Sequence, residues 1–339
     1  MKIDGALSMS VTRSGAEAAE FERMGLAGAW SFEANHDPFV PLTLASQTTE
    51  RIQLGTAIAV AYARTPMTAA VTAWDLQRLS GGRFILGLGT QIKPHIEKRY
   101  GMPWSNPARR MGEYVHALRA IWHSWSTGDR LDFRGEFYTH TLMTPAFSPG
   151  PNEVPPPPIY VAGVGPRMVR VIGEVADGFF VHPFHSVDFL RSDTLPLLEE
   201  GAVAAGRDSS EIDIACITIV AVGTNDEELD DARSKAKAQL AFYGSTPAYA
   251  GVLDHHGYEG LQPELNMMSK QGQWREMTEQ IDDELLGLLT VSGSPAEVGR
   301  KMAERNTFAN RSTMMFYGPT PSPETIAEIV DSIRAASSP

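Results

Sequence analysis

The sequence predicts a (β/α)8 barrel, in which eight parallel strands form a closed ring and a helix follows each strand. Short apolar runs alternate along the chain with amphipathic stretches, which is typical of βα units and a parallel sheet. The chain has 339 residues, more than the about 250 typical of such a barrel, so we expect a single domain over residues 1–339 with insertions. There are as many apolar runs as strands in this barrel, namely Ile3–Leu7, Ala27–Phe32, Ile52–Val60, Phe84–Leu88, Ile159–Ala162, Phe179–Val181, Ile212–Val222 and Thr313–Tyr317.

Signals for the start of a helix lie between these runs. Asp37-Pro38 and Thr65-Pro66 each place a capping residue before a proline, which is favoured at the first position of a helix. Thr224–Glu227 and Ser294–Glu297 have the residue types and the spacing of capping boxes. The sequence therefore predicts that helices begin at these places.

Two insertions interrupt the alternation. The first follows the fourth strand and spans about 89–158. It contains a helix at about Ala108–Ser126, a hairpin through Phe133–Thr141 and the run Pro155–Pro158, which cannot be helical. The second follows the helix after the seventh strand and spans about 244–277. Because Gly, Pro and polar residues are frequent there, we interpret it as an excursion, with a lid at one end of the barrel as one role.

The composition argues against several classes of function. The net charge of −12 argues against general binding to nucleic acid or to an anionic membrane. Cys216 is the only cysteine, which excludes an intramolecular disulfide and a cysteine-rich metal site, and no His, Asp and Glu set has the spacing of metal ligands. The start of the chain lacks an apolar signal core, and no apolar run reaches the about 20 residues that span a bilayer. We therefore expect a cytoplasmic protein.

The active site of such a barrel lies at the C-terminal ends of its strands. Four histidines are nearest to this face, and each can transfer a proton near neutral pH: His36, His95, His182 and His185. A structural hydrogen bond is the alternative interpretation for each of them. The segments that follow the second to fifth strands reach the same face, and they are Glu33–His36, Ala57–Tyr62, Gly89–Gln91 and Gly163–Gly165.

Two features of this face indicate an anionic ligand. The glycines of Gly163–Pro166 allow the backbone to approach an anion closely, and a helix that opens near Arg167 would direct free N–H groups towards it. An ordinary βα turn is the alternative for this segment. The loop after the fourth strand carries five basic residues against one acid, Glu97, in an acidic chain. A solvated surface loop is the alternative for these five, which are Lys93, Lys98, Arg99, Arg109 and Arg110.

Several segments carry a resemblance to a known family. They are Leu54–Ile58 with Arg64–Pro66, Leu79–Thr90, Pro158–Pro166 with Ala176–Gly178, and Ala241–Tyr249. From Ile3 to about Tyr317 the sequence resembles the luciferase-like monooxygenase superfamily, most closely its actinobacterial branch that uses coenzyme F420, a deazaflavin. Ala241–Tyr249 looks like a mark of one subgroup of F420-dependent oxidoreductases.

The resemblance implies a bound F420 and assigns its contacts by position. In F420-dependent relatives the third strand ends in a bulge with a non-prolyl cis peptide behind the tricyclic ring, and the matching bond is Ala57–Ile58. Thr90, which follows Gly89, matches a position close to the ring, and His95 matches a polar residue near it. The basic loop would then meet the oligoglutamate tail of F420, which FMN lacks. The family's phosphate loop falls on Ala162, Gly163, Val164 and Gly165.

Two departures limit what the resemblance assigns. In F420-dependent sugar-phosphate dehydrogenases the catalytic histidine matches Ala34 and an acidic residue matches Ile92, and neither replacement can transfer a proton. We therefore reject glucose-6-phosphate dehydrogenation for this chain. Glu33, Asn35 and His36 lie close enough in sequence to take the place of the missing histidine.

The sequence thus predicts hydride transfer between carbon 5 of the deazaflavin and a small organic substrate. A nearby group balances the proton, with His36 preferred to His95 and His182, and Glu33 is a further candidate. One alternative keeps the fold but uses reduced FMN, as the oxygenase of a two-component monooxygenase. Another is a non-catalytic barrel subunit or a ligand-binding protein. A homodimer is expected from the relatives, and the variable loops leave the substrate open.

Overall fold

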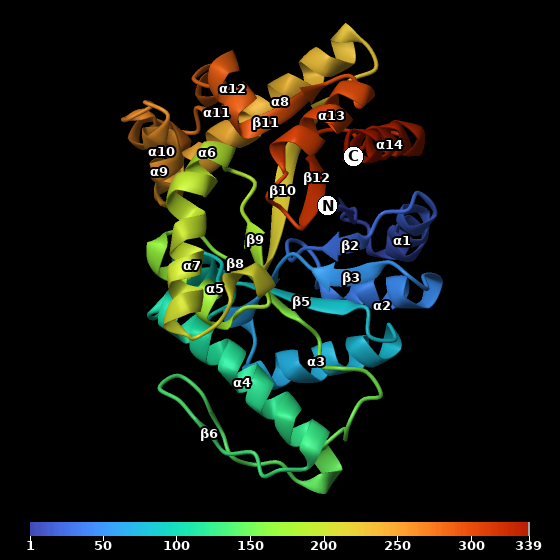
Figure 1. Ribbon diagram of the computed structural model, residues 1–339. Helices are drawn as coiled ribbons and strands as arrows, with labels where there is room; N and C mark the ends of the chain where they lie inside the picture. Colours follow the sequence, from blue (N-terminus) through green and yellow to red (C-terminus); the bar gives the residue numbers. More distant parts are fainter. Residues whose placement is uncertain (338–339) are drawn as a thin grey trace. The chain divides into compact units, whose positions relative to one another are not determined.

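The strands run parallel in the chain order of a (β/α)8 barrel, as the sequence predicts (Figure 1). The computed structural model describes residues 1–337. Its internal contacts group the chain into two compact units. The N-terminal unit comprises Gly5–Phe180 and Leu197–Asp213, and the C-terminal unit comprises Met1–Asp4, Val181–Pro196 and Ile214–Pro339. The expectation of one domain over residues 1–339 stays a prediction.

The N-terminal unit is an arc of parallel strands with helices between them in sequence. β3 pairs with β2 and β5, and β8 pairs with β5 and β9. Every residue of β2, β5 and β9 is buried, which is typical of parallel strands covered on both faces. The strands are β1 (Lys2–Ala6, shared with the C-terminal unit), β2 (Gly28–Ser31), β3 (Gln53–Thr56), β4 (Ala59–Val60), β5 (Phe84–Gly89), β8 (Ile159–Ala162) and β9 (Gly178–Val181). The helices are α1 (Ser14–Arg23), α2 (Phe39–Thr48), α3 (Pro66–Leu79), α4 (Pro107–Thr127), α5 (Pro166–Val175) and α7 (Leu195–Ala204).

The first predicted insertion contains the expected elements. α4 (Pro107–Thr127) is the helix that the sequence predicts there, and β6 (Phe133–Arg134) and β7 (Thr139–His140) form the predicted antiparallel hairpin. In Figure 1 this hairpin lies beside one end of α4. The carboxylate of Glu113 on α4 holds the hairpin turn, because it accepts hydrogen bonds from the backbone N–H groups of Glu136, Phe137 and Tyr138.

Three aromatic rings from β2, β8 and β9 pack against one another in the N-terminal unit. Trp30 on β2 meets Phe180 on β9 edge to face at 5.2 Å between ring centroids, and Tyr160 on β8 lies 5.4 Å from Phe180. Gly55 on β3 makes room for the indole, since a Cβ there would lie 2.3 Å from a ring carbon of Trp30. All three rings are almost fully buried, so they form part of the core of this unit.

A β-bulge interrupts the third strand. Gly55 pairs with Ile85 and Ala59 pairs with Leu88, so three residues of the β3–β4 strand face two residues of β5. The hydroxyl of Thr56 takes the place of the missing ladder bonds, because it accepts from the N–H of Gly87 at 2.9 Å and donates to the carbonyl of Gly87 at 2.7 Å. A Cβ on Gly87 would lie 1.7 Å from the carbonyl oxygen of Thr56, which explains the glycine.

We expect Thr56→Val, which keeps the shape of the side chain but removes its hydroxyl, to lower the free energy of unfolding by about 2–4 kcal/mol. The reason is that the buried N–H and C=O groups of Gly87 would lose their partner. Urea unfolding followed by tryptophan fluorescence measures the loss. Thr56→Ser keeps the hydroxyl and should cost only about 1 kcal/mol for the lost methyl group. Equal stability of the two variants would contradict this role of the hydroxyl.

The C-terminal unit contains a second group of parallel strands and most of the later helices. β10 pairs with both β11 and β12. The short strand β11 is an addition that the sequence does not predict, and it pairs only with the last four residues of β10, from Ile219 to Val222. The strands are β10 (Asp213–Val222), β11 (Thr290–Gly293) and β12 (Arg311–Phe316). The helices are α6 (Val187–Phe189), α8 (Asp226–Gly244), α9 (Ala250–His255), α10 (Leu261–Lys270), α11 (Trp274–Glu279), α12 (Asp283–Leu289), α13 (Pro295–Arg305) and α14 (Pro323–Ser337).

The second predicted insertion is helical. The sequence predicts an excursion over about 244–277 without assigning its secondary structure, and α9, α10 and α11 occupy most of it (Figure 1). Its glycines separate helices: Gly257, Gly260 and Gly272 all have positive φ and lie between them. These helices share a hydrophobic core with α8 and α12. The residues of this core include Leu240, Leu253, Leu265, Met277 and Leu285. A role as a lid stays a prediction.

A buried ion pair joins the first and last strands within the C-terminal unit. Arg311 on β12 donates from Nε and Nη2 to the two carboxylate oxygens of Asp4 on β1, at 2.8 and 2.9 Å. Neither side chain has solvent-exposed surface. The unit also contains the single thiol of the chain, that of Cys216 on β10, which is fully buried. Burial raises the pKa of Cys216 to about 12.

The predicted helix starts agree with the structure in two cases and shift in two. Thr65 caps α3 before Pro66, and Ser294 forms the predicted capping box with Glu297. α8 is capped by Asn225, one residue after the predicted position. α2 begins at Phe39, and Asp37 accepts the N–H of Phe39 from two residues upstream.

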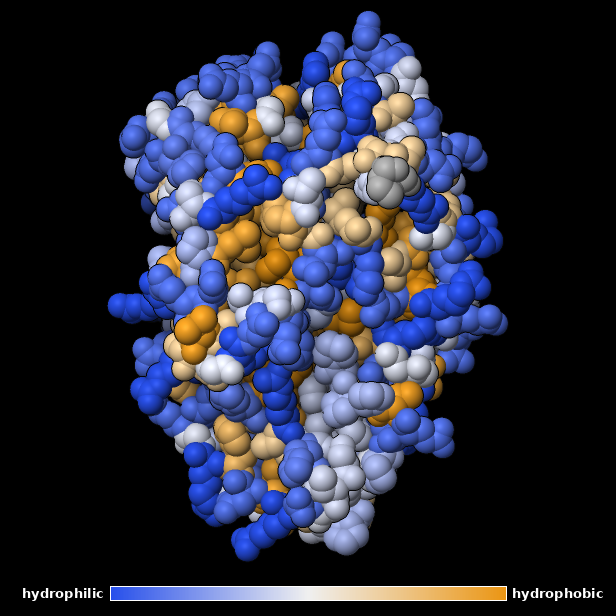
Figure 2. All heavy atoms as spheres, in the orientation of Figure 1, coloured by the Kyte–Doolittle hydropathy of each residue, from blue (hydrophilic) through white to orange (hydrophobic). Residues whose placement is uncertain are grey.

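The face in Figure 2 is mostly hydrophilic, with hydrophobic residues in smaller groups between the hydrophilic ones. Within residues 1–337, no helix combines the length and the apolar character that a bilayer crossing requires.

Candidate functional site

The predicted site residues lie in both units. Those after β2, β3, β5 and β8 belong to the N-terminal unit, whereas His182 follows β9 and belongs to the C-terminal unit. Within the N-terminal unit the strand order brings the ends of β2, β3, β5 and β8 into adjacent positions. The C-terminal strand ends therefore gather the predicted residues of this unit as expected.

The end of the third strand has the predicted backbone. The peptide bond between Ala57 and Ile58 is cis and lies in the bulge. The bulge is tied to the end of β2, because Ala57 N–H donates to Ser31 at 2.7 Å and Glu33 N–H donates to Ile58 at 3.1 Å. Gly89 on β5 packs against it, since a Cβ on Gly89 would lie 2.8 Å from Cγ1 of Ile58. Backbone and the Ile58 side chain thus form one wall of the candidate site.

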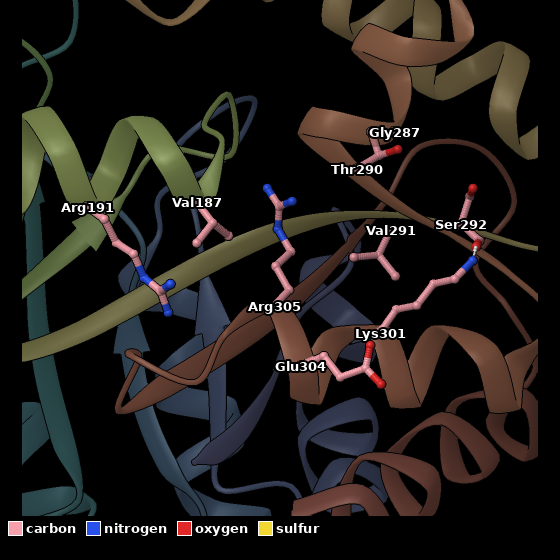
Figure 3. Close-up of a pocket in the computed structure, with 9 residues that line it drawn as sticks. All are labelled: Val187, Arg191, Gly287, Thr290, Val291, Ser292, Lys301, Glu304 and Arg305. Carbon is pink, nitrogen blue, oxygen red and sulfur yellow. Dashed lines mark hydrogen bonds between the residues drawn. The ribbon is translucent and has the colours of Figure 1, made fainter. Parts of the chain in front are cut away.

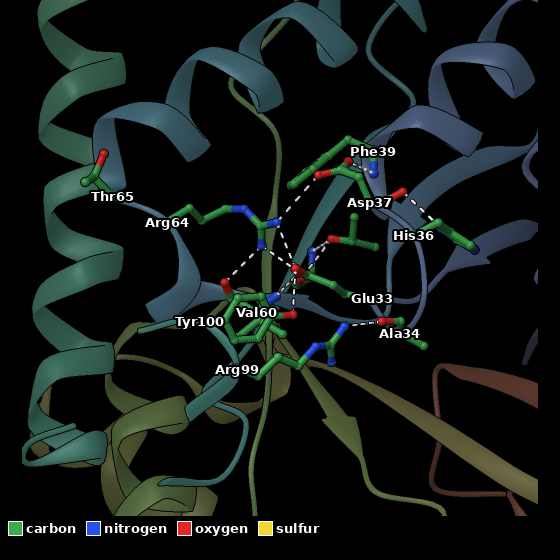
Figure 4. A network of polar contacts seen from close by, with 12 residues as sticks. Glu33, Ala34, His36, Asp37, Phe39, Val60, Arg64, Thr65, Arg99 and Tyr100 are labelled. Carbon is green, nitrogen blue, oxygen red and sulfur yellow. Dashed lines mark hydrogen bonds and ion pairs between the residues drawn. The ribbon is translucent and has the colours of Figure 1, made fainter. Parts of the chain in front are cut away.

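Glu33 is the centre of a buried polar network (Figure 4). Its carboxylate accepts from Nη1 and Nη2 of Arg64 at 2.6 and 3.0 Å, from the N–H of Val60 at 2.6 Å and from the hydroxyl of Tyr100 at 3.0 Å. Only 7% of the Glu33 side chain is exposed. Burial disfavours the charge on Arg64, but the hydrogen bond and charge of Glu33 outweigh it and raise the pKa of Arg64. This network fixes the loop after β2 to the start of α3.

The same network joins the two loops that carry His36 and His95, because Glu33 belongs to the first loop and Tyr100 follows the turn that His95 begins. His36 stands at its edge in Figure 4, with Nδ1 3.1 Å from the carbonyl oxygen of Asp37. Its Nε2 is buried and has no hydrogen-bond partner within residues 1–337. His95 is exposed and begins the π-helical turn His95–Arg99. From the same turn, Arg99 donates to the carbonyl oxygen of Ala34. The proton-transfer roles of His36, His95 and Glu33 stay predictions.

The glycine loop leads into a helix as predicted. α5 begins at Pro166, and no side chain caps its first turn. Gly163 packs against the helix, because a Cβ there would lie 2.2 Å from Cγ of Met168. Gly165 has φ of 84°, and a Cβ there would meet no atom within 4 Å, so the space over this residue is open. An anion can therefore approach the backbone at Gly165.

The basic loop is less uniform than the sequence indicates. Arg110 is buried, lies 4.4 Å from the ring centroid of Tyr62, and donates to the hydroxyl of Tyr138 at 2.8 Å. Arg109 pairs with Glu136 at 2.7 Å. The interpretation of all five cations as one ligand-binding surface is therefore wrong for Arg110, which has a structural role. Lys93 pairs with Glu97 and Arg99 packs on Tyr100, so Lys98 is the one exposed cation of the five without an ion pair, hydrogen bond or ring contact within residues 1–337.

In the C-terminal unit His182 belongs to a cluster of aromatic rings. Its Nδ1 accepts the N–H of Phe184 at 3.1 Å, and its Nε2 lies 3.0 Å from the hydroxyl of Tyr249, whose ring stacks on the imidazole at 4.4 Å. Tyr243 lies edge to face with His182 and hydrogen-bonds to the hydroxyl of Tyr317 at 2.6 Å. Burial lowers the pKa of His182 to about 3, so the imidazole is neutral at pH 7. Its predicted catalytic role stays a prediction.

Sequence reasoning missed the tyrosines of this cluster. Tyr243 and Tyr249 lie within Ala241–Tyr249, the segment that marks the resemblance to one subgroup, so a signal was present. Tyr317 comes from the end of β12, and its contact with Tyr243 joins residues far apart in the chain. Within residues 1–337, no group of His, Cys, Asp and Glu side chains has an arrangement that could hold a metal ion.

Comparison with known proteins identifies the family of this chain. A family model described as luciferase-like monooxygenase matches residues 4–311. The chain belongs to this family. The luciferase-like chain is 51% identical over 293 residues to an uncharacterized protein of Mycobacterium tuberculosis, with 86% of each chain covered. It is 30% identical over 301 residues to a protein of the same species named for coenzyme F420-dependent oxidoreductase activity, which covers 85% of this chain and 84% of that protein.

A solved structure shows the same luciferase-like fold. It is the coenzyme F420-dependent tetrahydromethanopterin reductase from Methanopyrus kandleri, with a TM-score of 0.78. The two chains are 23% identical, and the match covers 97% of this chain and 96% of the reductase. At 23% identity this likeness supports the barrel architecture alone. The cofactor and the substrate have to be inferred from the geometry of the candidate site.

Proposed function

We propose that this luciferase-like protein is an oxidoreductase that uses coenzyme F420 to transfer a hydride to or from a small organic substrate. The observation that carries the proposal is the bulge at Thr56–Ile58, because the sequence resemblance associates a bulge at this place with the deazaflavin ring. The relative that is named for F420 dependence supports the choice of cofactor. The cytoplasmic location and the homodimer stay predictions.

The residues at these strand ends fit such a cofactor. Gly89 allows close packing beside Ile58, where a Cβ would fill the wall, and the open face of Gly165 leaves backbone N–H groups accessible to a phosphate. In this proposal the ring lies against Ala57, Ile58, Gly89 and Thr90, with His95 near it. The phosphate lies on the loop formed by Ala162, Gly163, Val164 and Gly165.

When bound, F420 supplies a ring carbon that accepts or donates a hydride. We assign proton transfer to His36. With the Nδ1 proton donated to the carbonyl of Asp37, Nε2 carries a lone pair, and this buried atom has no partner within residues 1–337. It can therefore accept a proton from a substrate hydroxyl or return one. His182 and Glu33 rank behind His36, because their polar atoms already hold hydrogen bonds.

Titration with each cofactor tests the proposal. We expect F420 to bind with saturable quenching of fluorescence, and FMN to bind at least tenfold more weakly. Tight binding of FMN with none of F420 would replace the proposal by the flavin monooxygenase alternative. Absence of binding by either cofactor would favour the non-catalytic alternative.

A charge placed on the glycine loop tests where the cofactor binds. Val164→Asp is expected to weaken F420 binding at least tenfold, because a like charge about 4 Å from a phosphate costs roughly 4 kcal/mol near a protein surface. Val164→Asn has nearly the same shape without the charge and is the matched control, with binding close to that of the unmodified protein. Equal F420 affinities of the two variants would move the phosphate away from this loop.

A further inference from the structure

A cationic cavity of about 480 Å³ opens within the C-terminal unit (Figure 3). It lies between the segment that begins at α6, the strand β11 and the helix α13. None of its lining residues is among those predicted for the cofactor or for proton transfer. Val187 and Val291 give it an apolar part, and the charged residues that line it are Arg191, Lys301, Glu304 and Arg305.

The charges of this cavity differ in sign from those of the whole protein. Three cations and one acid line it, whereas the chain carries a net charge of −12. None of the three cations forms an ion pair with a carboxylate within residues 1–337. Concave sites lined by one sign of charge concentrate small ions of the opposite sign. The cavity therefore favours an anion.

Two hydrogen bonds hold the guanidinium of Arg305 in place, and some of its N–H donors remain unused. It donates from Nη1 to the carbonyl of Leu288 at 3.0 Å and from Nη2 to the carbonyl of His185 at 2.9 Å. Its Nε is buried and has no hydrogen-bond partner in the described part of the chain. A guanidinium has five N–H donors, and an unpaired buried donor costs about 1–3 kcal/mol. Burial also lowers the pKa of Arg305, since no acid compensates its charge closely.

The other two cations are positioned by neutral groups. Lys301 donates to the carbonyl of Ser292 at 2.7 Å, and Arg191 donates to the hydroxyl of Thr307 at 3.3 Å. In Figure 3 the side chain of Arg305 extends between Val187 and Val291, with Arg191 and Lys301 on either side. Their orientation is therefore set while their charge stays uncompensated.

We propose that this cavity binds a compact oxyanion with two or more negative charges, carried by phosphate or by several carboxylates. Arg191, Lys301 and Arg305 supply the charge, and the spare N–H donors of Arg305 bind the anion. Glu304 opposes it and limits the affinity. Because Arg305 also holds the carbonyl of His185, a bound anion stabilises the segment that follows β9.

Calorimetric titration at constant ionic strength tests the site, with pyrophosphate and citrate as probes. We expect one anion per chain, and about tenfold weaker binding for each of Arg191→Gln and Lys301→Gln. Glu304→Gln should bind more tightly, because it removes the opposing charge. Lys270→Gln, at an exposed lysine outside the cavity, is the matched control and should bind like the unmodified protein. Arg305 is left unchanged, because it holds two backbone carbonyls.

The two probes separate the possible ligands. Binding of pyrophosphate alone assigns the site to phosphates, and binding of citrate alone assigns it to carboxylates. The proposed cofactor loop also attracts phosphate, so the titrations are repeated in Val164→Asp, in which binding at the cavity should be unchanged. No saturable binding of either probe, or an equal loss in Lys270→Gln and Arg191→Gln, would overturn the proposal. Loss in Val164→Asp alone would place the anion on the cofactor loop instead and would also overturn it.

Discussion

Replacing Arg311 by methionine is expected to lower the free energy of unfolding by about 3–5 kcal/mol. The substitution leaves the carboxylate of Asp4 without the two hydrogen bonds that it accepts from Arg311, in a place where neither side chain reaches solvent. A buried carboxylate that loses an ion pair is costly, because the surrounding protein solvates it far less than water does. Urea unfolding monitored by circular dichroism gives the loss.

The double variant Asp4→Leu with Arg311→Met separates the pair from its environment. Replacing a buried ion pair by apolar residues of similar volume is often neutral or stabilising by about 1–4 kcal/mol. We therefore expect the double variant to be more stable than Arg311→Met alone. If the two substitutions added their separate losses, packing would be the cause of the destabilisation, and the charge argument would be wrong.

Lowering the pH from 7 to 5 is expected to cost about 4 kcal/mol of unfolding free energy through His182 and His185 together. Burial is the main cause that lowers the pKa of each to about 3, and the charge of Arg305 contributes to the lowering for His185. In the unfolded chain both histidines take up protons near pH 6.5, whereas the folded chain does not, so the unfolded state binds more protons in this window. Stability is therefore complete above about pH 7 and is lost as the pH falls towards 3.

His185→Gln isolates one of the two contributions. The amide can keep the hydrogen bond that Nδ1 of His185 makes with the carbonyl of His182 at 2.8 Å, but it does not titrate. Urea unfolding at pH 7, 6 and 5 should show a mean pH slope smaller by about 1 kcal/mol per unit than that of the unmodified protein. Measurements above pH 5 avoid most carboxylate titration, and the other histidines are common to both proteins. Parallel slopes would show that His185 is protonated in the folded state.

The strands could be predicted because their signal is local. Each predicted run overlaps a strand of the structure, since a fully buried parallel strand needs a continuous apolar segment. β11 was missed because Thr290–Gly293 is short and polar at two positions, and it forms only beside the end of β10. The helices α9 and α11 have six residues each, too few to show helical periodicity. The segment was therefore interpreted as an excursion, without a prediction of its helices.

The candidate site was predictable in its backbone and less so in its side chains. The bulge at Thr56–Ile58 and the loop at Gly163–Gly165 depend on local backbone that the family resemblance carries. Partnerships between distant residues have no such signal. Tyr243 meets Tyr317 from another element, and the anion cavity collects cations from separate segments. Only the folded chain brings these groups together.

The single thiol of the chain, that of Cys216, allows local opening of the C-terminal unit to be measured. Thiol reagents attack the thiolate, and a fully buried Cys216 with a pKa near 12 offers almost none at neutral pH. Cys216 pairs with Ser312 across β10 and β12, so separation of these strands would expose it to a reagent. The rate at which a thiol reagent labels Cys216 therefore measures how often this part of the unit opens. No engineered probe is needed for this measurement.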